Sequence, residues 1–227
     1  MTELVIERLN QVSARIARAA ERSGRNPSEV KLVAVSKGVS PERLKKVLPH
    51  GLRVFGENRV QEFLQKYEIL GRQAEWHLIG HLQRNKAKYL IGKIAFIHSL
   101  DNFELAKLLD KLSSVQGRPW RVLIQVNVAG EATKFGVAPS QLAEFLDLMQ
   151  GLKGLEVCGL MTIAPYCEDP EEVRPVFRKL RELREEVSKT RPRLNLMDLS
   201  MGMSNDFEVA VEEGATIVRI GSALFAG

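Results

Sequence analysis

Lys37 is the side chain of this sequence best placed for covalent chemistry, because it directly follows the apolar run LVAVS at residues 32–36. An amine at the end of a buried strand lies against a partly dehydrated wall, which favours its neutral, nucleophilic form. A neutral amine attacks an aldehyde and forms a Schiff base. An exposed loop lysine and an ion-pair partner for Glu57 are the alternatives that position alone leaves open. Two segments of small residues near the C-terminus favour the Schiff-base lysine.

These two segments predict a pocket for an anion. Ser200 and Ser204 bracket Gly202 just before a helical pattern, and Gly221 and Ser222 open a short C-terminal turn. Small residues let backbone N–H groups and a helix N-terminus face a phosphate. In barrels of alternating strands and helices, the last two loops form the usual phosphate site. Either motif alone is an ordinary tight turn, but the two adjacent loops together predict a phosphate pocket.

Arg219 lies in the apolar run at residues 216–220, and strand alternation places it on the same face as Ile217. If that face is the interior of a barrel, the guanidinium needs a partner, because an unpaired buried charge is very unfavourable. A ring nitrogen or a carboxylate of a ligand would serve. An internal ion pair with Glu57 or Asp198 is the alternative.

The remaining candidate groups predict no further chemistry. His77 and His81 are four residues apart, a spacing that binds zinc on a helix. The run WHLIG that contains His77 is typical of a strand leading into a loop, so no metal site is expected. Cys158 lies in an apolar run and is expected to fill core space. Met201 and Met203 either pack in the core or cover a flat ring, and position does not decide between these roles.

Eight short apolar runs are the candidate strands that must position these groups. Buried parallel strands are near-continuous apolar runs, because helices cover the outside of the sheet. The candidates span residues 32–36, 53–55, 76–80, 95–98, 122–128, 156–162, 195–200 and 216–220.

Amphipathic segments with cap residues lie between these runs, so strand and helix alternate along the chain. Eight such units favour a closed (β/α)8 TIM barrel over an open, doubly wound sheet, and the fold class is α/β. Residues 4–22 carry apolar side chains at helical spacing and predict an extra N-terminal helix on one end or flank of the barrel. No linker or composition shift divides the chain, so one domain over residues 1–227 is expected.

Composition and charge favour a soluble, cytoplasmic protein. The net charge is +5, but 28 acidic residues are interleaved with the basic ones, which argues against a nucleic-acid surface. No window approaches the roughly 20 apolar residues that cross a bilayer, and charges interrupt the N-terminal segment where a signal peptide would be apolar. Cys158 and Cys167 lack CxxC spacing and are expected to be free thiols of a reducing compartment.

The sequence resembles the pyridoxal phosphate homeostasis proteins, also called YggS-like or proline synthetase co-transcribed proteins. The resemblance spans essentially the whole chain. It rests on seven segments in the order of that family: LVAVSK, FGENRVQE, WHLIGHLQRNK, HSLD, QVNVAGEATKFG, GLMTIAP and LSMGMSNDFEVAVEEGATIVRIGSALF.

The resemblance implies a fold-type III barrel, similar to the N-terminal domain of alanine racemase, with pyridoxal 5′-phosphate as an internal aldimine on Lys37. It further implies a role for six other residues. Asn58 would lie near the ring substituents, Met201 would cover a ring face, and Arg219 would face the pyridine nitrogen. The phosphate would be held by Ser200, Gly221 and Ser222.

The function that the resemblance implies is binding of pyridoxal phosphate for its homeostasis and for amino-acid and keto-acid balance, without strong catalysis and with no catalytic residue assigned. A monomer is expected, with apo-enzymes or regulatory proteins as possible recipients. The alternative is a pyridoxal-dependent racemase or lyase that uses Lys37 as one base and His81 or Tyr166 as the other. Only seven residues follow Ile220, which leaves no room for the second domain of similar racemases. A nucleic-acid binder using the basic residues 84–93 is a weaker alternative, because aromatic residues are sparse there.

Overall fold

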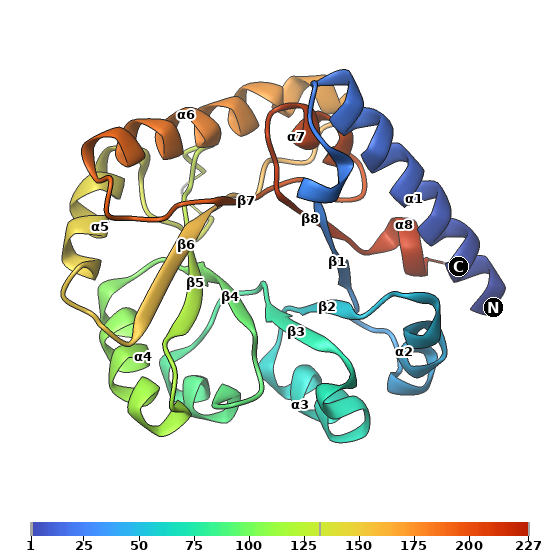
Figure 1. Ribbon diagram of the computed structural model, residues 1–227, viewed down its shortest axis with the longest axis horizontal. Coiled ribbons are helices and arrows are strands. Elements are labelled where there is room, and N and C mark those ends of the chain that lie inside the picture. The colour runs from blue at the N-terminus through green and yellow to red at the C-terminus, as the bar shows by residue number, and fades with distance from the viewer. Residues whose placement is uncertain (1, 132, 227) are drawn as a thin grey trace.

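Eight parallel strands close into a barrel in the computed structural model, which describes residues 2–131 and 133–226. The strands follow one another around the ring in chain order, and β8 pairs with β1 to complete it (Figure 1). This confirms the predicted barrel. The strands are β1 Lys31–Val35, β2 Val54–Glu57, β3 Glu75–Leu78, β4 Phe96–Leu100, β5 Trp120–Gln125, β6 Leu155–Met161, β7 Asp198–Ser200 and β8 Ile217–Ile220.

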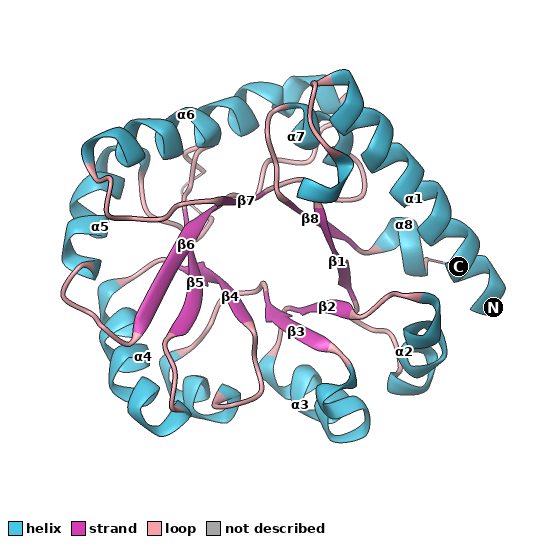
Figure 2. Cartoon of the chain, in the orientation of Figure 1, coloured by secondary structure: helices cyan, strands magenta, loops and turns pink. Residues whose placement is uncertain are grey.

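Helices surround the barrel on its outside (Figure 2). They are α1 Thr2–Arg22, α2 Pro41–Val47, α3 Val60–Leu70, α4 Phe103–Gln116, α5 Leu142–Met149, α6 Arg174–Thr190, α7 Phe207–Glu212 and α8 Ser222–Phe225. Each strand after β1 is thus reached through a helical connection, as the alternating pattern predicts. None of the described helices combines the length and the apolar composition needed to cross a membrane.

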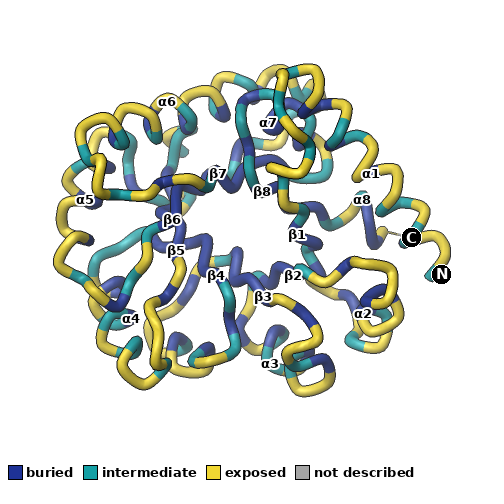
Figure 3. The backbone as a smooth tube through the Cα atoms, in the orientation of Figure 1, coloured by how far each residue is buried: buried dark blue, intermediate teal, exposed yellow. Residues whose placement is uncertain are grey.

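The strands are buried on both faces (Figure 3). Their outward side chains join the helices in one large apolar core. Their inward side chains form a smaller apolar cluster of Val33, Phe96, Leu123, Cys158, Met161 and Ile217, with Val54 and Ile163 packed against it. Residues that pair in register on neighbouring strands have side chains on the same face of the sheet. A residue that pairs with a member of this inner cluster therefore has its side chain inside the barrel.

Two strands depart from the sequence expectation by three residues at one end, and one helical connection also departs from it; the other strand ends lie within two residues of the expected ones. β7 begins only at Asp198, so the first half of the expected strand 195–200 is loop, and β5 ends at Gln125 instead of residue 128. The connection between β3 and β4 is a 3-10 helix over Arg84–Leu90, where a longer helical segment is expected. Only Ala87 and Leu90 are buried in that helix, so few apolar contacts hold it to the barrel.

The extra N-terminal helix α1 lies along the flank of the barrel beside α7 and α8 (Figure 1). Its buried residues, Val5, Val12, Ile16, Ala19 and Ala20, recur at helical spacing and form one apolar face. Arg15 adds an ion pair to Glu208 of α7 at 2.7 Å. The helix therefore supports the segment that leads into β8, and it lies on the flank of the barrel, one of the two places, an end or a flank, that the sequence predicts.

Candidate functional site

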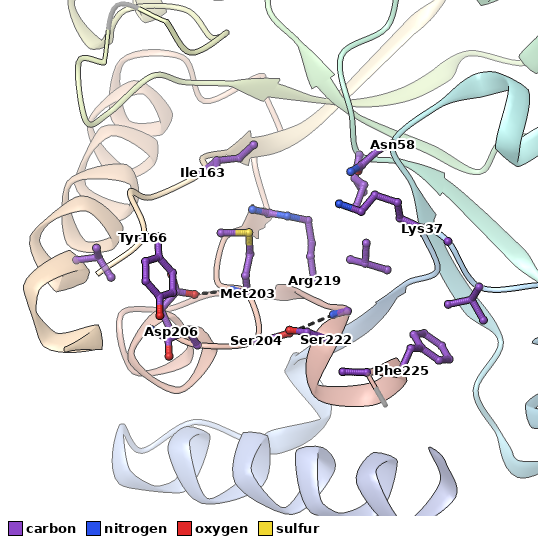
Figure 4. Close-up of a pocket in the computed structure, with 18 of the residues that line it drawn as sticks. Lys37, Asn58, Ile163, Tyr166, Met203, Ser204, Asp206, Arg219, Ser222 and Phe225 are labelled. Carbon is purple, nitrogen blue, oxygen red and sulfur yellow. Dashed lines mark hydrogen bonds between the residues drawn. The ribbon is translucent and has the colours of Figure 1, made fainter. Parts of the chain in front are cut away.

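A cavity of about 630 Å³ opens at the carboxyl ends of the strands. Functional groups of such barrels lie at this end, because each strand terminates there in a loop that is free to vary. The cavity is lined from the loops after β1, β2, β3, β6, β7 and β8 (Figure 4). Among its lining residues are Lys37, Asn58, Ile163, Tyr166, Met203, Ser204, Asp206, Arg219, Gly221 and Ser222.

Lys37 extends into this cavity from the loop that follows β1, and Asn58 lines it from the loop that follows β2 (Figure 4). Lys37 is exposed, more than a partly dehydrated amine would be, because the cavity is open to solvent. Glu57, the alternative partner of Lys37, is instead buried and bonded to Lys66 Nζ at 2.5 Å. Burial raises the pKa of the Glu57 carboxyl, while the hydrogen bond from Lys66 opposes that shift.

Arg219 reaches the cavity from inside the barrel. It pairs in register with Val33 of the inner cluster, so its side chain faces the barrel interior as alternation predicts. Nη1 donates to Ser200 Oγ at 2.6 Å, and Nη2 donates to the Thr162 carbonyl at 2.9 Å. Burial lowers the pKa of Arg219 to about 10, so the guanidinium remains protonated at neutral pH.

The alternative ion pair of Arg219 with Glu57 or Asp198 is not formed. Glu57 is bonded to Lys66, and Asp198 Oδ1 accepts a hydrogen bond from Thr216 at 3.2 Å. Within the described part of the chain, no carboxylate lies at ion-pair distance from Arg219. The guanidinium is therefore a buried cation that lines the cavity and has two neutral acceptors, while the charge of the nearby Asp206 carboxyl opposes the lowering of its pKa.

Small residues of the last two loops form a polar corner of the cavity. Ser204 Oγ accepts hydrogen bonds from the backbone N–H groups of Gly221 at 3.3 Å and Ala223 at 3.2 Å. Gly221 and Ser222 line the same corner. Hydroxyl groups and backbone amides gathered in this way are the donors that a phosphate takes.

Ser200 and Met201 lie outside the cavity lining, unlike the expectation from the resemblance. Ser200 is fully buried and bonded to Arg219, and Met201 is fully buried in the outer core. Strand alternation sends Ser200 into the barrel and Met201 toward the helices. Gly202 then adopts a φ of +91°, and this turn directs Met203 and Ser204 into the cavity instead.

Asp206 is a cavity residue that sequence reasoning missed. Its Oδ1 accepts a hydrogen bond from the Met203 backbone N–H at 2.6 Å, which fixes the turn between Gly202 and α7 (Figure 4). Burial raises the pKa of the Asp206 carboxyl. Asp206 stands at the N-cap position of α7, but its side chain bonds back to the preceding turn and not to the helix, so a helix-capping pattern in the sequence does not reveal this role.

The two candidates for a second base differ in position. Tyr166 lines the cavity, whereas His81 stacks on Phe135 at a ring distance of 3.9 Å and lies 3.5 Å from Asp101.

His77 faces the barrel interior, so the side chains of His77 and His81 do not converge on one site. Cys158 is a free thiol in the inner cluster, and burial raises its pKa to about 11, as expected for core filling.

The groups in this cavity fit pyridoxal phosphate by the chemistry of their donors. An amine can take its aldehyde, a corner of hydroxyl groups and amides can take its phosphate, and a buried guanidinium can face its ring nitrogen. The apolar side chains of Ile163 and Met203 border the space between these polar groups.

Comparison with known proteins gives three concordant results. Residues 8–227 match the family model described as alanine racemase, N-terminal domain. The pyridoxal phosphate homeostasis protein of Aquifex aeolicus is 54% identical over 96% of both chains. The protein of the same name from Pseudomonas aeruginosa is 39% identical over 97% of this chain and 94% of its own.

Solved structures agree with this assignment. PipY of Synechococcus elongatus, determined with PLP bound, is 36% identical, covers 98% of this chain and 100% of its own, and superposes with a TM-score of 0.85. Alanine racemase of Corynebacterium glutamicum is only 18% identical, with a TM-score of 0.71 over 62% of its chain, and shares the fold. The chain belongs to the family of pyridoxal phosphate homeostasis proteins, within the wider family of alanine racemase N-terminal domains.

Proposed function

We propose that this protein binds pyridoxal 5′-phosphate through Lys37 and serves its homeostasis, and with it the balance of amino acids and keto acids. The names of its relatives and the PLP-bound structure of PipY support this role. The observation that carries the proposal is one cavity lined by Lys37, by Arg219 and by the corner of Ser204, Gly221 and Ser222.

Each end of the ligand has a partner in this proposal. Lys37 supplies the amine, Asn58 lies near the ring substituents, and Ser204, Gly221 and Ser222 hold the phosphate. Met203 takes the ring-covering place that the resemblance gives to Met201. Met201 packs in the outer core and stabilises the fold, and Ser200 holds Arg219 in place through a hydrogen bond. When bound, pyridoxal phosphate supplies an aldehyde that condenses with a primary amine and a ring that withdraws electrons.

Arg219 argues for carrying the cofactor rather than for strong catalysis. A guanidinium donates hydrogen bonds and does not give up its proton at neutral pH. Opposite the ring nitrogen, Arg219 would therefore leave that nitrogen unprotonated, which weakens the ring as an electron sink.

The test is chemical trapping on Lys37. We expect protein saturated with pyridoxal phosphate to be yellow, and borohydride reduction followed by mass spectrometry to place a pyridoxyl group on Lys37. Lys37→Ala should lose the adduct, while Lys31→Ala, at the other end of β1, should keep it. An adduct on another lysine of the wild-type protein, or no binding at saturating concentration, would overturn the proposal.

A racemase or lyase is the second candidate, because Tyr166 lines the cavity and offers an acid or base group opposite Lys37. Steady turnover of a free amino acid, lost in both Lys37→Ala and Tyr166→Phe, would favour it over the carrier role.

Further proposals concern the setting of the protein. We propose a monomer with one domain over residues 1–227 that acts in the cytoplasm, which agrees with the two free thiols. Light scattering after size exclusion tests the oligomeric state. The proposed recipients are apo-enzymes that use pyridoxal phosphate, or regulatory proteins. Recovery of activity by such an apo-enzyme, mixed with the loaded protein but not with Lys37→Ala, tests direct delivery.

A further inference from the structure

A chain of buried polar side chains connects Arg219 to the opposite end of the barrel. Arg219 Nη1 contacts Ser200 Oγ at 2.6 Å, and Ser200 Oγ contacts His98 Nδ1 at 2.9 Å. His98 Nε2 contacts His77 Nδ1 at 2.9 Å, and His77 Nε2 contacts Glu75 Oε1 at 2.8 Å. Four consecutive contacts of hydrogen-bond length thus link five side chains that come from β3, β4, β7 and β8.

All the side chains of this hydrogen-bonded series lie on the inner faces of these strands. His77 pairs in register with Phe96, and Ser200 pairs with Ile217 and Met161, all three of which belong to the inner cluster. His77, His98 and Ser200 are 1% exposed or less, while the side chain of Glu75 is 42% exposed at the amino end of β3. The chain therefore runs from the cofactor cavity to solvent at the opposite end of the barrel.

The two ends of the chain determine the direction of every hydrogen bond. An arginine only donates, so Ser200 Oγ accepts from Arg219. A carboxylate only accepts, so the proton of neutral His77 is on Nε2 and its Nδ1 accepts from His98 Nε2–H. Neutral His98 then accepts on Nδ1, and the Ser200 hydroxyl supplies that hydrogen. All four bonds point from Arg219 toward Glu75.

The charges along the chain agree with this direction. Burial lowers the pKa of His77 and takes that of His98 well below its usual value, so both rings are neutral at neutral pH. The hydrogen bond from His77 lowers the pKa of the Glu75 carboxyl to about 2, and Glu75 is therefore ionised. Three neutral groups thus join Arg219 to Glu75, and each charged end also has a neighbour of opposite sign: Lys31 lies 3.2 Å from Glu75 Oε1, and the charge of Asp206 acts to raise the pKa of Arg219.

We infer that Ser200, His98 and His77 are positioning residues that hold the Arg219 guanidinium toward the cofactor cavity, with the Glu75 carboxylate as the acceptor that fixes the direction of the hydrogen bonds at the far end of the barrel. Aligned hydrogen bonds polarise one another in a low-dielectric interior, so an accepting carboxylate at one end makes Ser200 Oγ a stronger acceptor for Arg219 at the other. The inference rests on the proposed function only in taking pyridoxal phosphate as the ligand that Arg219 faces.

The direction of the chain is tested on cofactor-free protein, independently of any binding. We expect nitrogen-15 NMR of labelled histidine at pH 7 to show His77 and His98 as neutral rings with the proton on Nε2, assigned with His77→Asn and His98→Asn. A proton on Nδ1 of either ring, or a charged ring, would overturn the inference.

The positioning role is tested with Ser200→Ala. Loss of one hydrogen bond to a charged group predicts a Kd for pyridoxal phosphate about tenfold higher. The pH at which the absorption band of the bound cofactor changes should also shift, a readout that loss of stability alone would not move. Cys158→Ala is the matched control, because Cys158 is buried in the same barrel interior but its thiol contacts the Glu156 carbonyl, outside the hydrogen-bonded series. Equal values for the two variants would contradict the inference.

Glu75→Ala tests the accepting end of the hydrogen-bonded series. We expect a Kd for pyridoxal phosphate about threefold higher, because the aligned bonds lose their final acceptor. Glu156→Ala is the control, since Glu156 is an exposed carboxylate near the start of β6 that pairs with Arg121 and with none of the five side chains. An unchanged Kd in Glu75→Ala overturns the role of Glu75. Failure of the wild-type protein to bind pyridoxal phosphate would instead refute the proposed function. The NMR result alone would then test the direction of the hydrogen bonds between Arg219 and Glu75.

Discussion

At the scale of single residues, the cavity depends on which side chains of the segment 200–204 face it. Ser200 and Ser204 both flank Gly202 in the sequence, but their hydroxyls have different partners. Ser200 Oγ accepts a hydrogen bond from Arg219 inside the barrel, whereas Ser204 Oγ accepts from backbone amides at the cavity corner. The Ser200 hydroxyl therefore holds the Arg219 side chain, and the Ser204 hydroxyl holds the loop after β8. Ser222 lines the same corner with its side chain making no hydrogen bond to the described residues.

Ser204→Ala and Ser222→Ala are expected to separate a hydroxyl that stabilises the fold as well as facing the ligand from one that serves the ligand alone. Without Ser204 Oγ, the amides of Gly221 and Ala223 lose their acceptor, so the free energy of unfolding should fall by about 1 kcal/mol. Ser222→Ala should stay within about 0.5 kcal/mol of the wild type but bind pyridoxal phosphate more weakly. Urea unfolding and cofactor titration measure both effects. Equal destabilisation by the two substitutions would contradict this division.

At the scale of elements, the loops after β2 and β3 fix each other through a close backbone contact. A Cβ added at Gly80 would lie 2.3 Å from the Asn58 carbonyl oxygen and 2.7 Å from the Asn58 Cα. Backbone cannot yield as a flexible side chain does, so only glycine fits at position 80. The loop after β3 thus holds Asn58 at the cavity.

Gly80→Ala is therefore expected to lower the free energy of unfolding by about 1–3 kcal/mol, as overpacking does. It should also weaken binding of pyridoxal phosphate, because Asn58 is displaced. Gly151→Ala is the control, since an added Cβ there meets nothing within 4 Å. Urea unfolding and cofactor titration of both variants are the measurements, and a Gly80→Ala protein as stable as the control would refute the role of the contact.

The same scale shows how far the sequence predicts the site. The apolar runs predict the barrel and bring Lys37, Asn58, Arg219 and the last loops to one end of it, because only strand order and alternation are needed. The turn at Gly202 is different. Its φ of +91° interrupts alternation, so the exchange of Met201 for Met203 at the cavity lies beyond what periodicity can predict. The hydrogen-bonded series through His98 joins side chains from four strands that are far apart in the sequence, so no local sequence pattern predicts it.

At the scale of the whole molecule, the barrel interior is divided between an apolar cluster and the polar chain from Arg219 to Glu75. Packing surrounds two neutral histidines with groups that exclude water, and the outer core and α1 complete the enclosure. Such an interior is stable only while both rings remain neutral. The unfolded chain has no such restriction, so protons bind to it more readily than to the folded protein at mildly acidic pH.

Acid should consequently destabilise the cofactor-free protein through His77 and His98. Both have a lowered pKa in the folded state, so their stabilising contribution is complete above the unfolded pKa near 6.5 and is lost as pH falls below it. Between pH 7.5 and 5.5 the free energy of unfolding should therefore fall, by at most about 1.4 kcal/mol for each ring, the loss that applies when the folded ring stays neutral throughout. Urea unfolding at the two pH values measures this loss.

His98→Asn isolates the effect, because it should reduce the loss of stability between the two pH values, whereas the surface substitution His50→Asn should leave that loss as in the wild type. Glu57 and Asp206 act with the opposite sign, since their raised pKa values make the folded state bind the proton more tightly, but both are present in all three proteins and cancel in the comparison. If His98→Asn loses as much stability on acidification as the wild type, the buried ring is not the group that responds, and the neutral chain through the barrel would have to be abandoned.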